Sequence, residues 1–404
     1  MPNKGILSTT KTRNTLAILG VIFFAANLRA PLTSVGPVIG EISLSLSLSK
    51  TAAGMLTTIP LVAFGLLSSF IPRFSQRFGM ELVLLLSLIL LGIGLGVRSL
   101  GSITTLFVGA ALVGTAITFG NVLMPAFIKT KFPKRIGVMM GIYSVGMNLT
   151  AALAAGLSIG IGKWTNLGWK ASIGIWVVLT IVGIIIWLPQ LLSARRKKKA
   201  TAKETLVDSK PIIKVNLLKS RLAWAVTIYM GLQSLMYYCF TAWLPKVAQD
   251  WGMSIEASGW VLAYVQFAQL PTTFVGSILA ARMRDQRFLS ALTGVLFILG
   301  ITGILIFKTK YILLWCILLG VASGLAFSLS MLFFVLRTQN TLQAAKLSGM
   351  AQSFGYLIAA TGPAIFGGIF DLTSSWTLSF VFLMLMSVVL LVAGVIAGKD
   401  SWVS

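Results

Sequence analysis

The sequence contains no histidine, only two cysteines and only nine acidic residues in 404. The absence of histidine removes the commonest proton shuttle and the commonest metal ligand in proteins. The cysteines, Cys239 and Cys316, are too few and too far apart for a disulfide framework or a cysteine-based metal site. The sequence also shows no Ser/His/Asp set and no phosphate-binding loop. It therefore predicts neither an enzyme nor a protein that holds a metal or cofactor.

Charge is scarce as well. Charged residues make up 10% of the chain and hydrophobic residues 57%, whereas a soluble globular domain is about 25% charged. A bilayer is crossed by roughly 20 consecutive apolar residues in a helix. Runs of this kind occur at about 15–40, 51–72, 81–98, 103–128, 136–162, 170–192, 221–245, 257–281, 288–307, 311–336, 347–370 and 375–398. We predict an all-α integral membrane protein with twelve transmembrane helices.

The net charge of +24 would suit a nucleic-acid partner, but its distribution argues against one. Of the 33 lysines and arginines, 25 fall in alternate segments that include both termini, 7 fall in the other segments, and Arg29 lies within the first run. An excess of basic residues marks the cytoplasmic side of a membrane protein. This bias predicts a multi-pass protein of the cell membrane with both termini in the cytoplasm and no nucleic-acid partner.

The longest polar segment, residues 193–220, contains the run "ARRKKKATAKETLVDSK". It is too charged to pack a core, so it predicts a basic cytoplasmic linker between two six-helix bundles, residues 1–192 and 221–404. The run serves as a topology anchor or binds anionic membrane lipid.

The two halves resemble each other weakly. "SKTAAG" before the second run matches "SIEASG" before the eighth at an offset of 205, and the same offset relates Arg77 to Arg282. Pro37 and Pro245 correspond at an offset of 208. Parallel repeats of this kind are typical of transporters that bind substrate at the membrane midplane between the halves.

The turn "PRFSQRFGMELVL" after the second run carries a family resemblance. Together with the twelve runs and the basic linker, it resembles the turn G-x-x-x-D-R-x-G-R-[RK] of the major facilitator superfamily. Arg77 and Gly79 match that pattern, whereas Pro72, Gln76, Met80 and Glu81 depart from it. In that family the turn is a conformational latch, so the resemblance implies such a role for Arg77 and Gly79, and for Arg282 at the repeat position.

Three further strings, "NLRAPLTSVGP", "GNVLMPAFIKTKFP" and "GLQSLMYY", extend the resemblance to nearly the whole chain. They are similar to the cyanate permease and 2-nitroimidazole transporter branch of the superfamily, and we predict a bacterial protein. The resemblance implies a secondary transporter with alternating access. Members of the branch do not share one substrate.

Arg29 is the feature that composition does not explain. A charge near the bilayer centre costs at least ~2.5 kcal/mol, and Arg29 lies about 21 Å along its helix. It shares a face of small and polar residues with Ala25, Thr33, Gly36 and Gly40, while the nine acidic residues all lie in loops or at span ends. The guanidinium is therefore a candidate anion site, or else it donates to backbone carbonyls that are freed by Pro31 and Pro37.

The other candidate substrate-binding residues are uncharged and polar. The repeat offset places Tyr237 opposite Arg29, and the remaining candidates lie in runs that line the cavity in this superfamily: Asn121, Tyr143, Gln233, Gln266 and Gln352. Each could equally form a hydrogen bond between helices, worth ~0.6 kcal/mol on average. A neutral, hydrogen-bonding wall with one cation suits a small anion such as cyanate, or a small polar heterocycle.

Two rival functions remain open, a multidrug exporter of the same fold and a membrane receptor without transport. A drug exporter usually needs acidic groups for cations, and a receptor leaves the duplicated halves unexplained. Energy coupling also stays open, because no run carries a central carboxylate or histidine. A proton or a counter-solute is a possible partner, and Glu41 and Asp371 are the candidate carboxylates at the outer ends of spans.

Overall fold

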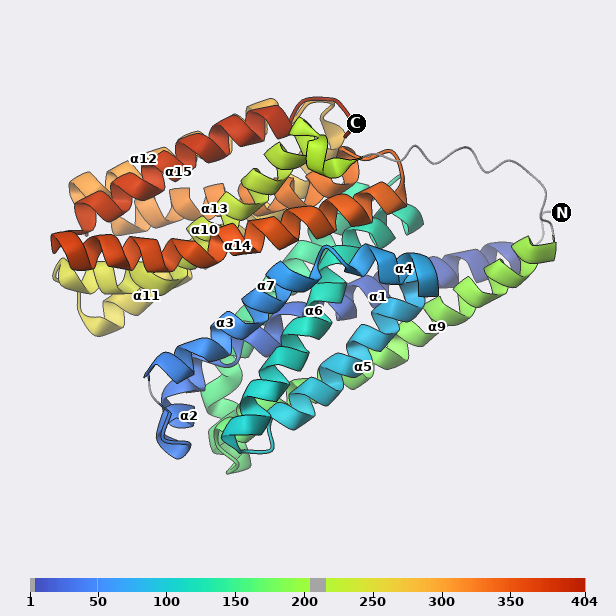
Figure 1. The fold of residues 1–404 in the computed structure, drawn as a ribbon, viewed down its shortest axis with the longest axis horizontal. Helices are drawn as coiled ribbons and strands as arrows, with labels where there is room; N and C mark the ends of the chain where they lie inside the picture. Colours follow the sequence, from blue (N-terminus) through green and yellow to red (C-terminus); the bar gives the residue numbers. More distant parts are fainter. Residues whose placement is uncertain (1–3, 49, 204–215, 404) are drawn as a thin grey trace. The chain divides into compact units, whose positions relative to one another are not determined.

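The computed structural model describes residues 4–48, 50–203 and 216–403, and within them the chain forms helices and no strand (Figure 1). The helices are α1 (Lys4–Thr33), η1 (Gly36–Val38), α2 (Ile39–Ser45), α3 (Lys50–Leu67), α4 (Ile71–Phe78), α5 (Met80–Arg98), α6 (Ile103–Lys131), α7 (Ile136–Thr165), α8 (Trp169–Gly174), α9 (Trp176–Lys203), η2 (Leu217–Lys219), α10 (Arg221–Asp250), α11 (Ile255–Arg282), α12 (Arg287–Phe307), α13 (Ile312–Leu336), α14 (Thr341–Thr373) and α15 (Trp376–Ala397).

Each of the twelve predicted spans coincides with one helix or with consecutive helices. Among the described residues, nine segments are long and apolar enough to cross a membrane, or ten when a bent pair is counted as one span. That pair is Met55–Leu67 with Ile71–Phe78, which meet at 63°. The predicted spans at α10 and α11 are not among these ten; their helices have 30 and 28 residues.

The chain forms two compact units. The first comprises residues 1–127 and 146–215, and the second comprises residues 128–145 and 216–404. The end of α6 and the start of α7 therefore group with the later helices. The predicted boundary in the basic segment 193–220 stays a prediction: α9 continues to Lys203, α10 begins at Arg221, and residues 204–215 lie outside the described part of the chain.

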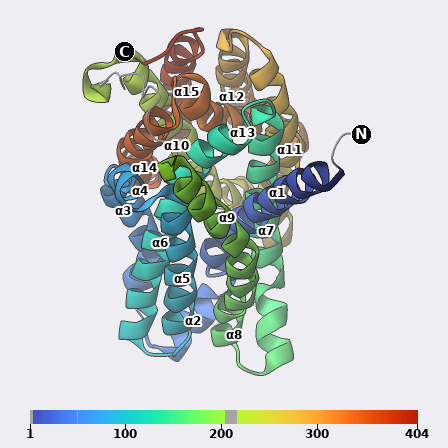
Figure 2. The same cartoon turned by 90° about the vertical axis from the view of Figure 1, so that its right-hand side faces the viewer.

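In the first unit, α9 runs alongside α1 and α5 (Figures 1 and 2). Trp187 of α9 is fully buried at this junction, with its ring centroid 5.2 Å from that of Phe24 and 4.9 Å from that of Phe127. Its indole nitrogen donates to the carbonyl of Glu81 at 3.0 Å, which satisfies the polar end of a buried tryptophan. A Cβ at Gly20 would lie 3.2 Å from the Trp187 ring, so a small residue there lets α1 approach.

In the second unit, α10 packs against α14, and α11 packs against α13. A Cβ at Gly231 would lie 3.0 Å from the Cα of Gly355, and a Cβ at Gly324 would lie 2.7 Å from the carbonyl oxygen of Gln269. Small residues permit such close helix contacts in membranes. Figure 2 shows α12 beside α13 and α15, the two helices that it contacts.

The first predicted span is broken. α1 contains Pro31 and ends at Thr33, after which η1 begins at Gly36 and α2 ends at Ser45. The two prolines in "RAPLTSVGP" interrupt the helix because proline lacks an N–H and clashes with the preceding turn. Arg29 therefore lies close to the end of a helix within the first predicted span.

Candidate substrate-binding site

Arg29 lies half-buried in α1, in a string whose other polar residues have structural roles. Asn27 is fully buried and joins α1 to α9: its Nδ2 donates to the carbonyl of Leu179 at 3.3 Å, and its Oδ1 accepts from Thr180 at 2.7 Å. Thr33 donates to the carbonyl of Ala151 at 3.0 Å, which joins α1 to α7. These bonds hold the α1 backbone before and after Arg29, so they restrict the position from which the Arg29 side chain extends.

Arg98 is a second arginine whose side chain is enclosed by helices, although the charge count placed it in an outer segment. It ends α5 and is 2% exposed. One terminal nitrogen donates to the carbonyl of Pro31 at 2.8 Å and the other to the carbonyl of Ile173 at 3.2 Å. The last carbonyls of a helix lack partners within it, and Arg98 supplies one to the broken end of α1. Arg98 therefore binds a carbonyl at the end of α1, and the alternative role of Arg29, as a donor to the carbonyls freed by Pro31 and Pro37, stays a prediction.

Asn121 is buried in α6, which approaches α1 closely at the preceding residue. A Cβ on Gly120 would lie 2.5 Å from both Leu28 Cδ2 and Phe24 Cε1. Since Leu28 precedes Arg29 and Gly120 precedes Asn121, the two candidates lie at the same level of neighbouring helices. The structure therefore supports the placement of Arg29 and Asn121 in one neighbourhood of the first unit.

In the second unit, the structure brings Tyr237 and Gln266 into direct contact. Nε2 of Gln266 on α11 donates to the hydroxyl of Tyr237 on α10 at 3.4 Å, and both side chains are half-buried. The Tyr237 ring also contacts Tyr238 edge-on, with centroids 5.4 Å apart. This polar and aromatic group joins two helices and remains partly accessible.

Gln233 and Gln352 are both buried, and each donates to a serine of its own helix. Gln233 on α10 reaches Ser234 at 2.7 Å, and Gln352 on α14 reaches Ser348 at 2.9 Å. Neither of these bonds joins the two helices.

Tyr143 is fully buried in the part of α7 that groups with the second unit. The start of α7 lies against α11: a Cβ on Gly141 would be 2.9 Å from Phe274 Cδ2, and one on Gly137 would be 2.8 Å from the carbonyl oxygen of Ser277. Tyr143 therefore groups with the second unit, whereas Arg29 and Asn121 belong to the first.

Gln269 is a stronger candidate than its sequence position suggested. It lies three residues after Gln266 on α11, which puts both on one helix face. It is 4% exposed, and its Oε1 is buried with no hydrogen-bond partner among the described atoms. Asn148 Nδ2 of α7 is a second such atom. Buried polar groups are normally paired, so these two amides mark positions suited to a hydrogen-bonding solute.

The proposed conformational turn contains a glycine, Gly79, in a backbone conformation that favours glycine. Gly79 joins α4 to α5 with φ +88°, a region that other residues rarely adopt. Arg77 lies in the last turn of α4 and Arg282 in the last turn of α11, and both are exposed. Their latch role remains a prediction.

Two other basic residues bind helix ends within the second unit. Lys129 of α6 donates to the carbonyl of Val335 at 2.6 Å, and also to the hydroxyl and carbonyl of Thr338. Arg337 is 2% exposed and donates to the carbonyls of Ala397 and Gly398 at 2.8 and 3.1 Å, and to the side chain of Gln286. Burial lowers the pKa of Arg337 from its ordinary value, and the carboxylates of Asp400 and Asp285 act against this.

Glu41, a candidate for coupling, has a local structural partner. Its Oε1 accepts from the backbone N–H of Trp169 at 3.0 Å, at the first residue of α8. Trp169 in turn donates through its indole to Ser45 at 2.7 Å. Asp371 is exposed near the end of α14. In the part of the chain that the structure describes, no three His, Cys, Asp or Glu residues form a group that could hold a metal.

Comparison with known proteins gives the family. Residues 16–363 match the Major Facilitator Superfamily. The chain is 41% identical over 387 residues to the uncharacterized transporter YycB of Bacillus subtilis, covering 96% of this chain and 94% of that protein. It is 33% identical to the 2-nitroimidazole transporter of Escherichia coli, covering 95% of each. It is 26% identical to the cyanate transport protein CynX of Escherichia coli, covering 90% and 92%.

The fold agrees with this relationship. The proton:xylose symporter XylE, in a complex with 6-bromo-6-deoxy-D-glucose, superposes with a TM-score of 0.74 at 13% identity, covering 94% of both chains. The predicted resemblance and fold class are thereby confirmed, and the chain is a multi-pass membrane transporter rather than an enzyme. It belongs to the Major Facilitator Superfamily.

Proposed function

We propose that this transporter carries a small anion such as cyanate, or a small polar heterocycle, by alternating access. Arg29 binds the solute electrostatically, and Tyr237, Gln266 and Gln269 contribute neutral hydrogen bonds. Two relatives that align over most of the chain are named for a nitroimidazole and for cyanate, and both of these solutes fit such a set of groups.

The observation that carries the proposal is the position of Arg29. It is half-buried near the broken end of α1, whereas the described acidic residues lie near helix ends or in loops. A guanidinium presents its donors in a planar fork that suits a small anion. Intramembrane charges are costly and are retained chiefly for function.

The Gln266 amide and the Tyr237 phenol, both in the second unit, add neutral hydrogen-bonding groups to the proposed site. A hydrogen bond of 3.4 Å from Gln266 to Tyr237 is long for a neutral pair, so the Gln266 amide can turn toward a solute at small cost. The unpaired Oε1 of Gln269 requires a donor, which a protonated heterocycle nitrogen supplies. This set suits small solutes that carry hydrogen-bond acceptors, and Gln269 adds a partner for those that also carry a donor.

We propose the cell membrane of a bacterium as the setting, since the relatives come from Bacillus subtilis and Escherichia coli. The charge distribution favours both termini in the cytoplasm. Among the described residues, no predicted span carries a carboxylate or a histidine near its centre. A proton would then travel on the solute or beside it, or the carrier would exchange one solute for another.

The experiment is thermal unfolding of the detergent-purified protein with cyanate, small carboxylates, nitroimidazoles and lipophilic cations, comparing wild type with Arg29→Gln and Arg29→Lys. A solute at a hundred times its Kd stabilises the folded state by about 2.7 kcal/mol. We expect anions to stabilise the wild type, Arg29→Lys to respond weakly because it loses the fork, and Arg29→Gln not to respond.

Counterflow of the stabilising solute in proteoliposomes then separates the rival functions. A receptor would bind the solute without exchanging it across the membrane. Stabilisation by lipophilic cations alone would favour the multidrug exporter. An Arg29→Gln variant that is folded and responds like wild type would remove Arg29 from the site.

A further inference from the structure

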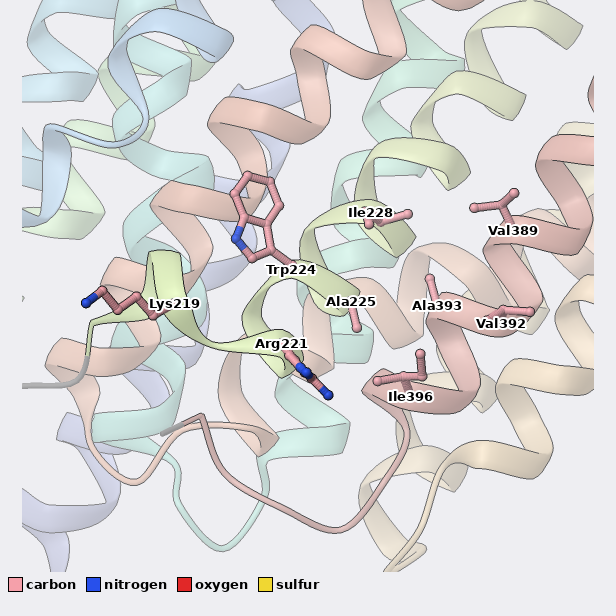
Figure 3. A pocket seen from close by; sticks show the side chains of 9 residues that line it. All are labelled: Lys219, Arg221, Trp224, Ala225, Ile228, Val389, Val392, Ala393 and Ile396. Atoms are coloured by element: carbon pink, nitrogen blue, oxygen red, sulfur yellow. The ribbon is translucent and has the colours of Figure 1, made fainter.

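A groove of about 320 Å³ lies between the start of α10 and the end of α15, away from the candidate solute residues. Figure 3 shows Ala225 and Ile228 of α10 facing a row of apolar side chains on α15, with Arg221 at one end of the row. The row consists of Val389, Val392, Ala393 and Ile396. Val389, Val392 and Ile396 are 43%, 52% and 48% exposed, so this wall is open to the surroundings.

The groove changes from charged to apolar along its length. Arg221 is the first residue of α10, and Lys219 lies two residues earlier in η2. From Arg221 the lining continues to Ile228, about 10 Å further along the helix. Both basic side chains are exposed, and neither forms an ion pair with any residue that the structure describes. The groove thus offers positive charge at its mouth and hydrocarbon contacts below it.

Trp224 marks the depth of this boundary. Its indole nitrogen donates to the carbonyl of Leu218 at 2.9 Å, and its ring lies 5.1 Å from that of Phe354. Tryptophan is enriched where a membrane protein meets the headgroup layer. The charged mouth therefore lies at headgroup level, and the apolar wall extends toward the acyl chains.

We propose that this groove binds an anionic phospholipid. Its phosphate pairs with Arg221 and Lys219, and one acyl chain lies against Val389, Val392 and Ile396. Basic pockets beside transmembrane helices on the cytoplasmic side suit acidic headgroups, and the charge bias places this end of α10 in the cytoplasm. A soluble anion would use the charge but not the apolar wall, so the two features together select a lipid.

The test uses the full chain in phosphatidylcholine vesicles that contain increasing fractions of phosphatidylglycerol with brominated acyl chains, which quench nearby tryptophans. The chain has eleven tryptophans, so the signal of Trp224 is taken as the difference from a Trp224→Phe variant. We expect quenching of Trp224 at a lower mole fraction of brominated phosphatidylglycerol than of brominated phosphatidylcholine.

Three variants test the two halves of the site. Arg221→Gln and Lys219→Gln should each raise the half-quenching fraction of phosphatidylglycerol about fivefold. Val392→Phe fills the groove without changing the charge and should also weaken quenching. Lys134→Gln and Arg135→Gln, each made singly, are the matched controls, because both residues are exposed and each variant loses one charge, as Arg221→Gln and Lys219→Gln do.

Each contrary outcome overturns the proposal. Equal half-quenching fractions for the two lipids would remove the anionic preference. A control variant that loses as much as the groove variants would leave only general attraction to the surface. If Val392→Phe had no effect, an acyl chain would not lie against the apolar side chains of α15. If inorganic phosphate reversed the quenching, the groove would be a site for free anions and not for a lipid.

Discussion

Arg29 and Arg98 belong to the same unit and have different surroundings. Arg98 is buried at the end of α5 and bonds two carbonyls from different helices, whereas Arg29 is half-buried within α1. The charge count cannot distinguish an arginine in an outer loop from one that turns inward at a helix end. Only packing reveals that Arg98 fastens the broken end of α1.

Replacement of Arg98 by Gln should lower the free energy of unfolding by about 2–4 kcal/mol, because two buried carbonyls lose a charged donor. Arg98→Lys should lose about half as much, since an ammonium on a flexible stem does not reproduce the fork. Thermal unfolding in detergent measures both. Arg135→Gln, an exposed arginine, serves as the control and should remain within about 0.5 kcal/mol of wild type; equal losses for Arg98→Gln and Arg135→Gln would contradict the role of Arg98.

At the level of helices, glycines set how closely α5 and α6 pack. A Cβ on Gly109 of α6 would lie 2.5 Å from the backbone nitrogen and 2.6 Å from the Cα of Arg98, whereas a Cβ on Gly96 of α5 would meet nothing within 4 Å. We expect Gly109→Ala to separate the helices and to cost about 1–3 kcal/mol from overpacking. Gly96→Ala should be neutral or stabilising by up to about 1 kcal/mol, because alanine favours helix.

The Gly109→Ala substitution also tests Arg98 indirectly. Gly109→Ala displaces the backbone that carries Arg98, so combining it with Arg98→Gln should cost less than the sum of the two single losses. Unfolding of the double variant measures this coupling. Strict additivity would show that the close helix contact and the arginine act independently.

The end of α13 depends on a lysine from α6. Lys129 bonds the carbonyl of Val335 and the hydroxyl of Thr338, and cations are favourable at the C-terminal end of a helix. Lys129→Met keeps the apolar stem and removes the donor. We expect faster hydrogen exchange in peptides that cover residues 334–340, because local opening becomes easier. Lys134→Met, at an exposed lysine, should leave exchange in this segment unchanged, and the same increase in both variants would exclude a specific clamp.

For the whole molecule, apolar periodicity and loop charge were sufficient to predict the helical class and a helix at each of the twelve runs, because the bilayer requires long apolar helices with satisfied backbones. The helices α10 and α11 are not among the described segments that are apolar enough to cross a membrane. The prolines of "RAPLTSVGP" also indicated the break after α1. What the sequence did not show depends on contacts between distant segments. The grouping of residues 128–145 with the second unit, the clamp by Lys129 and the burial of Arg98 all arise from packing at close helix contacts.

The sequence predicted the candidate site only in part, because only its charged member stands out in an apolar run. Arg29 stands out in sequence because a charge in an apolar run is costly. A polar amide carries no such signal, since Gln266, Gln269 and Gln352 look alike along the chain. Only the structure separates a glutamine that joins two helices from one that bonds a serine of its own helix, and from one with a buried oxygen lacking a partner.

The orientation of the whole chain is testable by labelling. Cys239 and Cys316 are buried, so their thiols should react slowly with a bulky maleimide. Cysteine introduced at Lys134, between α6 and α7, should react with a membrane-impermeant maleimide only after cells are permeabilised, because the charge bias places this turn in the cytoplasm. Cysteine at Lys310, between α12 and α13, should react in intact cells. The reverse pattern would invert the orientation and would move the basic mouth of the α10–α15 groove to the outer leaflet.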